Sequence, residues 1–381
     1  MAPSLYIHIP FCIRKCEYCD FYSGVATEQD IDAYLDALER EFELRFVERI
    51  TPATIFIGGG TPTRLSAKQL LRLGDLLRAR VDLSACSEFT CEINPGTLTP
   101  AKAEALVAMG VNRASFGVQS FKTKYLGGLG RAYEAGTATA AVEMARTAGI
   151  ERVSMDLIFA LPGQTLQELR EDIDTALGHG TEHLSFYALT YEDDTPLTRQ
   201  LLNGELQPCP EELEREMFTL VGETCTAAGL QRYEVSNFAK PGAECRHNLV
   251  YWTLGDWHGL GSGAHGMIDG EISAVAADYK VYTRLISEGT LPFSRREKLA
   301  DMSRAETLLL MGLRLTSGVE LSRFEQWAGG SFESLCGEKA AALKSQGLLE
   351  TSPTHVRATP AGLLVLDSLI LELASSMETT V

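Results

Sequence analysis

From residue 4 to about residue 190, short apolar and β-branched runs alternate with longer stretches in which apolar residues recur every three or four positions. This alternation is typical of βα units that build a parallel sheet. We expect six strands, at 5–9, 54–57, 88–93, 113–117, 153–159 and 183–189. We expect helices between them at about 30–48, 67–80, 100–109, 134–148 and 166–177. Six such strands suit either a doubly wound α/β sheet or a partial barrel.

Beyond about residue 300 the pattern becomes mainly helical. We expect a helix capped by Ser303 that runs through Arg314, a second helix at 333–346, a two-stranded wing at 348–358 and a helix at 363–373. This order predicts a smaller C-terminal helical domain of winged-helix-like shape. Residues 301–381 carry six Lys and Arg against ten Asp and Glu, whereas a DNA-binding domain needs a basic face. We therefore expect a lid or a partner-docking role for this domain, and no nucleic acid as partner.

Three cysteines follow the first expected strand, Cys12, Cys16 and Cys19, in the spacing C-x3-C-x2-C. Three thiolates at this spacing can ligate three irons of a cubane [4Fe–4S] cluster and leave the fourth iron open. The alternatives are a zinc site or a disulfide. A zinc site usually has four ligands in two pairs, and nine cysteines with no export leader do not suit a disulfide framework. The cysteines therefore favour an iron–sulfur cluster.

Size and charge narrow the class of protein. A chain of 381 residues is long enough for two or three domains, and 45% hydrophobic with 22% charged residues is ordinary for a globular protein. The net charge of −17 opposes attraction to nucleic acid and to anionic lipid. The most apolar late segment, 363–373, is interrupted by Asp367 and Glu372, so we expect no membrane-spanning helix. Reduced thiols and an oxygen-sensitive cluster lead us to expect a cytoplasmic protein.

Polar residues stand where the expected strands end. The second strand runs into Gly58, Gly59 and Gly60, the third ends at Glu92, the fourth at Gln119, and the fifth carries Asp156. A glycine-rich turn alone is weak evidence for a ligand site, and this one lacks the lysine of a P-loop. The carboxyl ends of parallel strands meet at one edge, however, so these side chains are expected to share a pocket.

The cysteine motif, with Tyr18 directly before its third cysteine, resembles that of the radical SAM superfamily. Segments 6–12, 58–63, 92–95, 115–120 and 156–165 together resemble the coproporphyrinogen-dehydrogenase/HemW branch, and the resemblance extends from residue 5 to about 370. It implies a radical SAM partial (β/α)6 barrel with a smaller C-terminal domain, and S-adenosylmethionine (SAM) on the open iron. The implied regions are a core at 1–236, a connecting region at 237–300 and a C-terminal domain at 301–381. The SAM contacts that it implies are Tyr6, Tyr18, Gly59, Gly60, Thr61, Glu92, Gln119, Arg131 and Asp156.

Two subfamilies of this branch differ in the sequence after the third cysteine. The oxygen-independent coproporphyrinogen III dehydrogenases carry a fourth cysteine two residues later, where this chain has Phe21. The HemW heme chaperones lack that cysteine and carry an HNxxYW motif, which is found here at 247–252. Two departures are Tyr133, where histidine is usual, and Ser262, where proline is common. The resemblance implies a heme chaperone that passes heme to an acceptor protein, and coproporphyrinogen III oxidase or a redox-sensing iron–sulfur protein are the alternatives.

The HNxxYW motif is open to two interpretations. A neutral His247 imidazole can ligate heme iron, and Tyr251 and Trp252 can stack on a porphyrin. Alternatively these residues form a buried aromatic corner of the core. Cys245 and His265 are the other iron ligands that the sequence offers nearby. The sequence names no acceptor protein, leaves open whether SAM is cleaved, and leaves the assembly state open, with a homodimer among the options.

Overall fold

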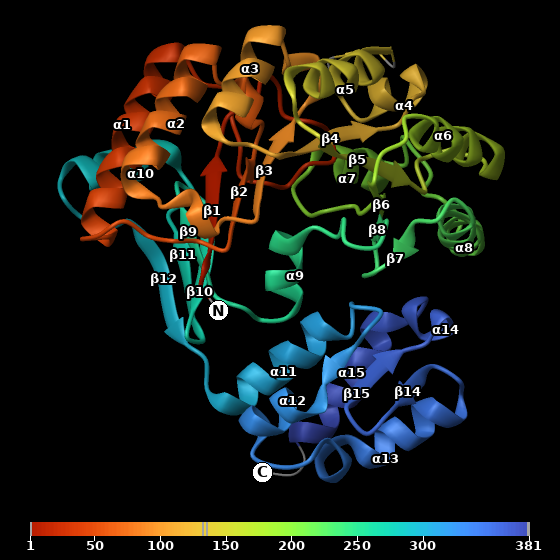
Figure 1. The fold of residues 1–381 in the computed structure, drawn as a ribbon. Helices are drawn as coiled ribbons and strands as arrows, with labels where there is room; N and C mark the ends of the chain where they lie inside the picture. Colours follow the sequence, from red (N-terminus) through yellow and green to blue (C-terminus); the bar gives the residue numbers. More distant parts are fainter. Residues whose placement is uncertain (1, 132, 135, 379–381) are drawn as a thin grey trace.

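The computed structural model describes residues 2–131, 133–134 and 136–378. Twelve strands among these residues form one sheet, in the order β12-β11-β10-β9-β1-β2-β3-β4-β5-β6-β8-β7 (Figure 1). Its centre consists of six parallel strands: β1 (Ser4–Ile9), β2 (Thr54–Gly59), β3 (Glu88–Ile93), β4 (Arg113–Gln119), β5 (Arg152–Phe159) and β6 (His183–Ala188). Two short strands extend it beyond β6, and four extend it beyond β1: β7 (Gln231–Arg232), β8 (Asn237–Ala239), β9 (Trp257–Leu260), β10 (His265–Ile268), β11 (Glu271–Val275) and β12 (Phe293–Lys298).

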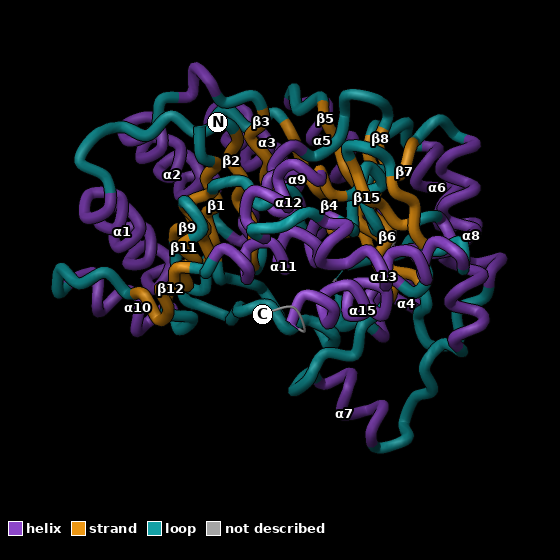
Figure 2. Tube along the Cα trace, turned by 90° about the horizontal axis from the view of Figure 1, so that it is seen from below, coloured by secondary structure: helices purple, strands orange, loops and turns teal. Residues whose placement is uncertain are grey.

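Helices follow the parallel strands and cover one face of the sheet, which we call the outer face (Figure 1). They are α1 (Glu28–Arg45), α2 (Ala67–Arg80), α3 (Pro100–Met109), α5 (Gly136–Ala148), α6 (Leu166–Gly178) and α8 (Glu211–Ala227). The short helices α4 (Thr123–Gly128) and α7 (Pro196–Leu202) contribute Tyr125 and Leu197 to a separate small cluster with Tyr18, and α7 stands apart from the sheet in Figure 2. Two later helices, α9 (Arg246–Trp252) and α10 (Tyr279–Ser287), belong to the same part of the molecule. The predicted α/β fold with a partial (β/α)6 barrel is therefore confirmed.

Local sequence explains where these elements begin. Thr27 caps α1 and Ser66 caps α2, each in a capping box with the residue three positions later. Along β1 the side chains alternate: Leu5, Ile7 and Ile9 are fully buried in the main hydrophobic core with residues of α1. Tyr6 and His8 must then point to the opposite face of the sheet, which we call the inner face.

Residues 237–300, which we expected to connect two domains, supply β8 to β12 and so extend the sheet itself. β9 pairs in parallel with β1, and β9 to β12 continue as antiparallel neighbours. The register sets Ser4 opposite Trp257 and Tyr6 opposite Gly259. Trp257 therefore lies on the inner face with Tyr6, because paired residues of neighbouring strands point the same way.

The remaining residues form a smaller C-terminal unit, which lies below the sheet in Figure 1 and in front of it in Figure 2. It contains α11 (Asp301–Gly312), β13 (Val319–Glu320), α12 (Leu321–Ala328), α13 (Phe332–Ser345), β14 (Leu349–Thr351), β15 (His355–Ala358), α14 (Pro360–Leu363) and α15 (Leu366–Glu378). The β14–β15 wing agrees with the predicted winged-helix-like shape. The predicted Ser303 cap is wrong, because α11 begins at Asp301 after Ala300.

The C-terminal unit packs directly against the sheet. Its hydrophobic core includes Leu254 and Met267, with Trp257 and Ile272 packed against it. Backbone hydrogen bonds also cross the junction, from Val235 N–H to Arg314 C=O at 3.0 Å. The C-terminal unit thus has its own hydrophobic core, which also includes side chains from the inner face of the sheet.

Candidate functional site

The three motif cysteines lie on a loop, residues 12–24, that leaves the carboxyl end of β1. We call this segment the cysteine loop. Its base is closed by a backbone bridge: Cys12 N–H donates to Gly24 C=O and Gly24 N–H donates to Pro10 C=O, both at 2.9 Å. All three thiols are partly exposed. The loop is therefore a defined projection of the barrel mouth, by which we mean the carboxyl ends of β1 to β6.

Glu17 ties the middle of the cysteine loop to two other segments. Its N–H donates to Leu129 C=O at 3.1 Å, and its C=O accepts from Leu197 N–H, at the start of α7, at 2.9 Å. Gly130 has a φ of 74°, and a Cβ there would lie 3.2 Å from the Glu17 nitrogen. The close approach of these backbones carries Tyr18 to Arg131, whose Nη2 donates to the Tyr18 hydroxyl at 2.8 Å.

The thiols of the cysteine loop interact with one another. Burial raises the pKa of Cys19 to about 11, a backbone hydrogen bond from Phe21 opposes this, and Cys16 and Cys12 raise it further. Burial also raises the pKa of Cys16, which Arg131 opposes. Among the described residues, no three His, Cys, Asp or Glu side chains lie close enough to hold a single metal ion. A cubane does not need that arrangement, since each thiolate ligates a different iron, and the three-thiol donor set fits such a cluster.

The glycine segment, Gly58–Gly60, completes β2 and runs beside the end of β1. Gly59 has a φ of 108°, and a Cβ there would lie 2.5 Å from the ring of His8. A Cβ on Gly60 would lie 2.9 Å from the backbone of Phe11. The next residue, Thr61, lies against Cys12, with 3.5 Å between Oγ1 and Sγ. Only glycines allow this approach, which places the segment against the cysteine loop.

Two carboxyl groups share the inner face near the mouth. Glu92 Oε2 accepts from Gly59 N–H at 3.0 Å, and Asp156 Oδ2 accepts from the Ser115 hydroxyl at 2.9 Å. Burial, and then the charge of Asp156, raise the pKa of Glu92 to about 8. Burial also raises the pKa of Asp156. Two buried carboxyls whose charged forms are disfavoured suit a ligand that brings positive charge or donors.

Gln119 and Arg131 converge on Gly117, near Asp156. A Cβ on Gly117 would lie 3.0 Å from Gln119 Nε2 and 3.4 Å from Arg131 Nη2. Gly117 pairs with Asp156 in the sheet. Gln119 has a φ of 67°, a strained conformation for a residue other than glycine. Arg131 Nε is buried and has no hydrogen-bond partner in the part of the chain that the structure describes. An unpartnered guanidinium donor fits the carboxylate of an amino-acid ligand.

Two residues of the mouth were not predicted to hold it together. His8 links β1 to the cysteine loop: its Nε2–H donates to Tyr22 C=O at 3.0 Å, and its Nδ1 accepts from the Tyr6 hydroxyl at 3.0 Å. Tyr133, noted only as a departure, donates its hydroxyl to Gly117 C=O and Val118 C=O at 2.9 and 2.7 Å. His8 carried a signal in the sequence, as a polar residue two positions after Tyr6 in an apolar strand.

His247, Tyr251 and Trp252 lie at the other end of the strands, with Thr54 and Phe56. We call this group the HNxxYW corner. Thr54, which begins β2, donates its hydroxyl to Ser4, so it accepts from His247 Nδ1–H, at 2.7 Å. His247 Nε2 lies 2.8 Å from the Tyr251 hydroxyl. β1 carries Ser4 at one end and the cysteine loop at the other, so roughly 16 Å of strand separates Thr54 from the loop. Phe56 nevertheless reaches toward the mouth, because its ring packs 6.2 Å from that of Tyr6, centroid to centroid.

The His247 imidazole is fully buried, and burial lowers its pKa to about 3. Its ring packs 5.2 Å from Phe56 and 5.1 Å from Tyr251, centroid to centroid. Both ring nitrogens are already hydrogen-bonded. In this conformation the residue therefore has the surroundings of a buried aromatic corner, the interpretation that competed with heme ligation. Trp252 differs, because its Nε1 is buried without a partner among the described residues.

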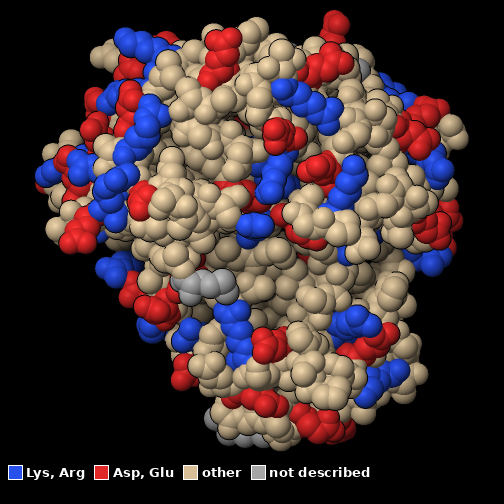
Figure 3. Space-filling model, viewed as in Figure 1, with Lys and Arg blue, Asp and Glu red and all other residues tan. Residues whose placement is uncertain are grey.

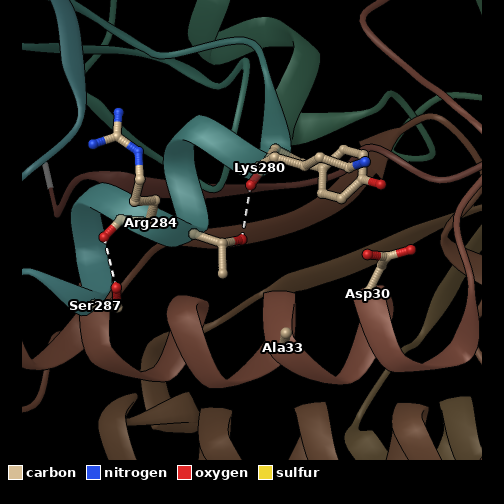
Figure 4. Close-up of a pocket in the computed structure, with 7 residues that line it drawn as sticks. Asp30, Ala33, Lys280, Arg284 and Ser287 are labelled. Atoms are coloured by element: carbon tan, nitrogen blue, oxygen red, sulfur yellow. Dashed lines mark hydrogen bonds between the residues drawn. The ribbon is translucent and has the colours of Figure 1, made fainter.

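Two cavities lie away from the inner face of the mouth. One, of about 340 Å³, lies between α1 and α10 (Figure 4). Its Thr283 and Ser287 hydroxyls donate to backbone carbonyls of their own helix, which leaves them engaged. The other, of about 650 Å³, lies where Phe159 and Ala188 end their strands and meet α8 and Leu363 of α14. The second cavity thus lies at the junction of the two units.

On the face drawn in Figure 3, acidic and basic side chains are interspersed and neither kind forms a large patch. Among the described residues, no helix has the length and apolarity required to cross a membrane.

Known proteins resemble this chain over nearly its whole length. Residues 6–176 match the radical SAM superfamily and residues 301–365 match the HemN C-terminal domain. The heme chaperone HemW of Bacillus subtilis is 40% identical over 365 residues, which covers 95% of this chain and 96% of that protein. The heme chaperone HemW of Lactococcus lactis is 37% identical and covers 94% of each chain. Among solved structures, coproporphyrinogen III oxidase (HemN) of Escherichia coli matches with a TM-score of 0.85 at 24% identity, covering 100% of this chain and 91% of that one.

Proposed function

Because this chain belongs to the HemW family of the radical SAM superfamily, we propose that it is a heme chaperone that binds heme and transfers it to an acceptor protein. The observation that carries the proposal is the similarity to HemW proteins over almost the full length of both chains. The match to coproporphyrinogen III oxidase supports only the shared fold, because the identity is 24%. Phe21 stands where the oxidase branch carries its fourth cysteine, and 66% of its surface is exposed.

Membership in this superfamily implies a [4Fe–4S] cluster and SAM. The three thiols of the cysteine loop are suited to hold the cluster. When bound, a reduced cluster of this kind supplies an electron to the SAM sulfonium. Arg131, whose buried Nε has no partner among the described residues, would bind the SAM carboxylate, and the Gly58–Gly60 segment would offer backbone groups beside the cysteine loop. Glu92, Gln119 and Asp156 then line the pocket from neighbouring strands.

Heme is the cargo in this proposal, and the acceptor is a second protein. Tyr6 and Tyr18 hold residues of the mouth in place through their hydroxyls, which bond His8 and Arg131. At the other end of the strands, Tyr251 and Trp252 are aromatic surfaces on which heme could stack. A heme role for the HNxxYW corner stays a prediction, as do a homodimer, a cytoplasmic location and the domain limits at residues 236 and 300.

The proposal is tested with the full chain after anaerobic reconstitution of the cluster. We expect about four irons per chain, saturable binding in a titration with hemin, and loss of bound heme to an added heme-free acceptor. The same preparation, supplied with SAM and a reductant, should not decarboxylate coproporphyrinogen III. Rapid decarboxylation would instead establish the oxidase alternative, and a preparation that binds no heme would contradict the chaperone proposal.

A further inference from the structure

Heme iron needs an accessible side chain with a free electron pair, and most histidines of this chain do not offer one. His8, His183 and His247 are buried, and each is hydrogen-bonded through both ring nitrogens. Ligation by any of them would first break a buried hydrogen bond and leave its partner unpaired. Such a loss typically costs about 1–3 kcal/mol.

Three further histidines lie away from the inner face. His179 ends α6 and is hydrogen-bonded to Thr139. His258 pairs with Leu5, which points it to the outer face, where its ring lies 5.0 Å from Phe46. His355 lies on β15 of the C-terminal unit, with its Nδ1 bonded to Thr354. None of these positions adjoins the cysteine loop.

His265 combines the properties that the others lack. It begins β10 and is exposed. Within the described parts of the chain, no group is hydrogen-bonded to its ring, although its backbone C=O accepts from Trp257 Nε1 at 2.9 Å. Met267 pairs with Trp257, so Met267 and, two residues earlier, His265 belong to the inner face. His265 is also near enough to His8 to interact with it electrostatically.

The surroundings of His265 suit a flat apolar ligand. The turn before it, residues 261–264, contains two glycines, and a Cβ on Gly263 would lie 3.4 Å from Tyr22 and 3.8 Å from His8 Nε2. Tyr22 ends the aromatic pair that begins with Phe21, whose ring is largely exposed. The turn therefore packs directly against Tyr22 of the cysteine loop. The exposed Phe21 ring next to Tyr22 in the chain is an apolar surface on which a porphyrin could stack.

The thiol of Cys245, directly before α9, is less suitable as an iron ligand than His265. Cys245 is 3% exposed, its Sγ donates to Glu88 at 3.5 Å, and burial raises its pKa to about 12. The thiolate that iron requires is therefore strongly disfavoured.

We propose that His265 is the axial ligand through which this chain holds heme iron, at the rim of the barrel mouth and beside the cysteine loop. The inference rests on the proposed function, because it assigns an iron ligand to a heme chaperone. A ligand on an exposed rim leaves the opposite heme face accessible to an acceptor, which suits a cargo that must be released. A ligand in the buried HNxxYW corner would require the core to open first.

The test compares His265→Ala with His355→Ala in the full reconstituted chain, each titrated with hemin and with iron-free protoporphyrin IX. In His265→Ala we expect hemin to bind about tenfold more weakly and its Soret band to shift. Added imidazole should restore the wild-type spectrum. Protoporphyrin IX should bind equally well to both variants, because it has no iron to ligate. His355→Ala should match the wild type with both probes.

The outcomes separate this inference from the proposed function. If His265→Ala keeps the wild-type hemin affinity and spectrum, the ligand assignment is wrong while the chaperone proposal stands. If His247→Ala alone changes the spectrum and still assembles its cluster, the ligand lies in the HNxxYW corner. If the wild type binds neither porphyrin, the proposed function itself fails. Cluster content, measured as iron and sulfide per chain, reports whether each variant is folded.

Discussion

At the barrel mouth, Arg131 lies buried with no partner for its Nε among the described residues, and Glu92 is held with a raised pKa. In the HNxxYW corner, by contrast, both nitrogens of His247 are hydrogen-bonded. Both regions carry a sequence motif, yet they meet different physical demands. A polar group left unsatisfied in a buried pocket lowers stability, and a ligand that completes it removes that cost. Polar groups that satisfy one another stabilise the fold. The difference indicates that Arg131 of the mouth is suited to a ligand, whereas His247 and Tyr251 of the corner stabilise the fold. Trp252 Nε1 is the exception in the corner, a buried donor without a partner among the described residues.

The largest effect is expected from removing one thiol of the cysteine loop. Cys12→Ala should remove the cluster completely, because a cubane held by three thiolates loses one of its three anchors. Iron and sulfide content and the EPR signal of the reduced protein measure this loss. Cys86→Ala and Cys336→Ala are matched controls, since both thiols lie outside the loop, and both variants should keep the full iron content. Loss of the cluster in either control would contradict the assignment of the three ligands.

The next largest effect is expected from adding a side-chain atom to the mouth while all thiols are kept. Gly59→Ala should lower the free energy of unfolding by about 3–5 kcal/mol, because the new Cβ meets the His8 ring in a left-handed backbone conformation. Gly163→Ala is the control: its φ is 70°, but nothing lies within 4 Å of the added Cβ. That variant should lose only about 1 kcal/mol. Equal losses in urea unfolding of the two variants would show that the His8 contact is unimportant.

The corner is tested by removing its central ring. His247→Ala should lower the free energy of unfolding by about 2–4 kcal/mol, because it leaves a cavity and removes the acceptor of the Tyr251 hydroxyl. His355→Ala, on the C-terminal sheet, should change it by less than about 0.5 kcal/mol. A His247→Ala protein as stable as the wild type would remove the contrast between corner and mouth.

The smallest effect is a pH dependence that belongs to the mouth. The folded pKa of Glu92, about 8, exceeds its ordinary value, so the stabilising preference for the protonated form is complete below about pH 4.5 and is lost as the pH rises toward 8. Glu92→Gln should therefore flatten the decline in melting temperature of the cofactor-free protein between pH 5 and 8. The variant should gain about 1–3 kcal/mol relative to the wild type at pH 8. Glu104→Gln, on the exposed side of α3, should leave the profile unchanged.

The alternating strands and helices up to residue 190 were predictable, because their apolar periodicity is strong and their caps are local. The convergence of Glu92, Gln119 and Asp156 was predictable from the rule that parallel strands end together. The later strands, β7 to β12, were not predictable from the sequence. β12 consists mostly of charged residues, and β9 is four residues long with a central glycine, so neither has a periodic signal. β9 is placed in the sheet by pairing with β1, which lies far away in sequence, and β12 is placed by pairing with β11, across α10.

The site showed the same division between local and distant information. The motifs located the cysteine loop and the glycine segment, since both depend on neighbouring residues. The hydrogen bonds of His247 to Thr54, and of His8 to Tyr22, join segments that only the folded sheet brings together. The motif at 247–252 therefore indicated importance but did not reveal that both imidazole nitrogens are engaged.

Within the described residues the sheet is open, and its two edge strands affect the tendency of the protein to aggregate at high concentration. An open margin offers unpaired backbone groups to any passing strand and so invites aggregation. One margin, β12, presents Arg295, Arg296, Glu297 and Lys298 to solvent, and the other, β7, is only two residues long. A highly charged edge strand and a two-residue edge strand are both poor templates for pairing with a further strand. We therefore expect the open sheet to resist edge-to-edge association.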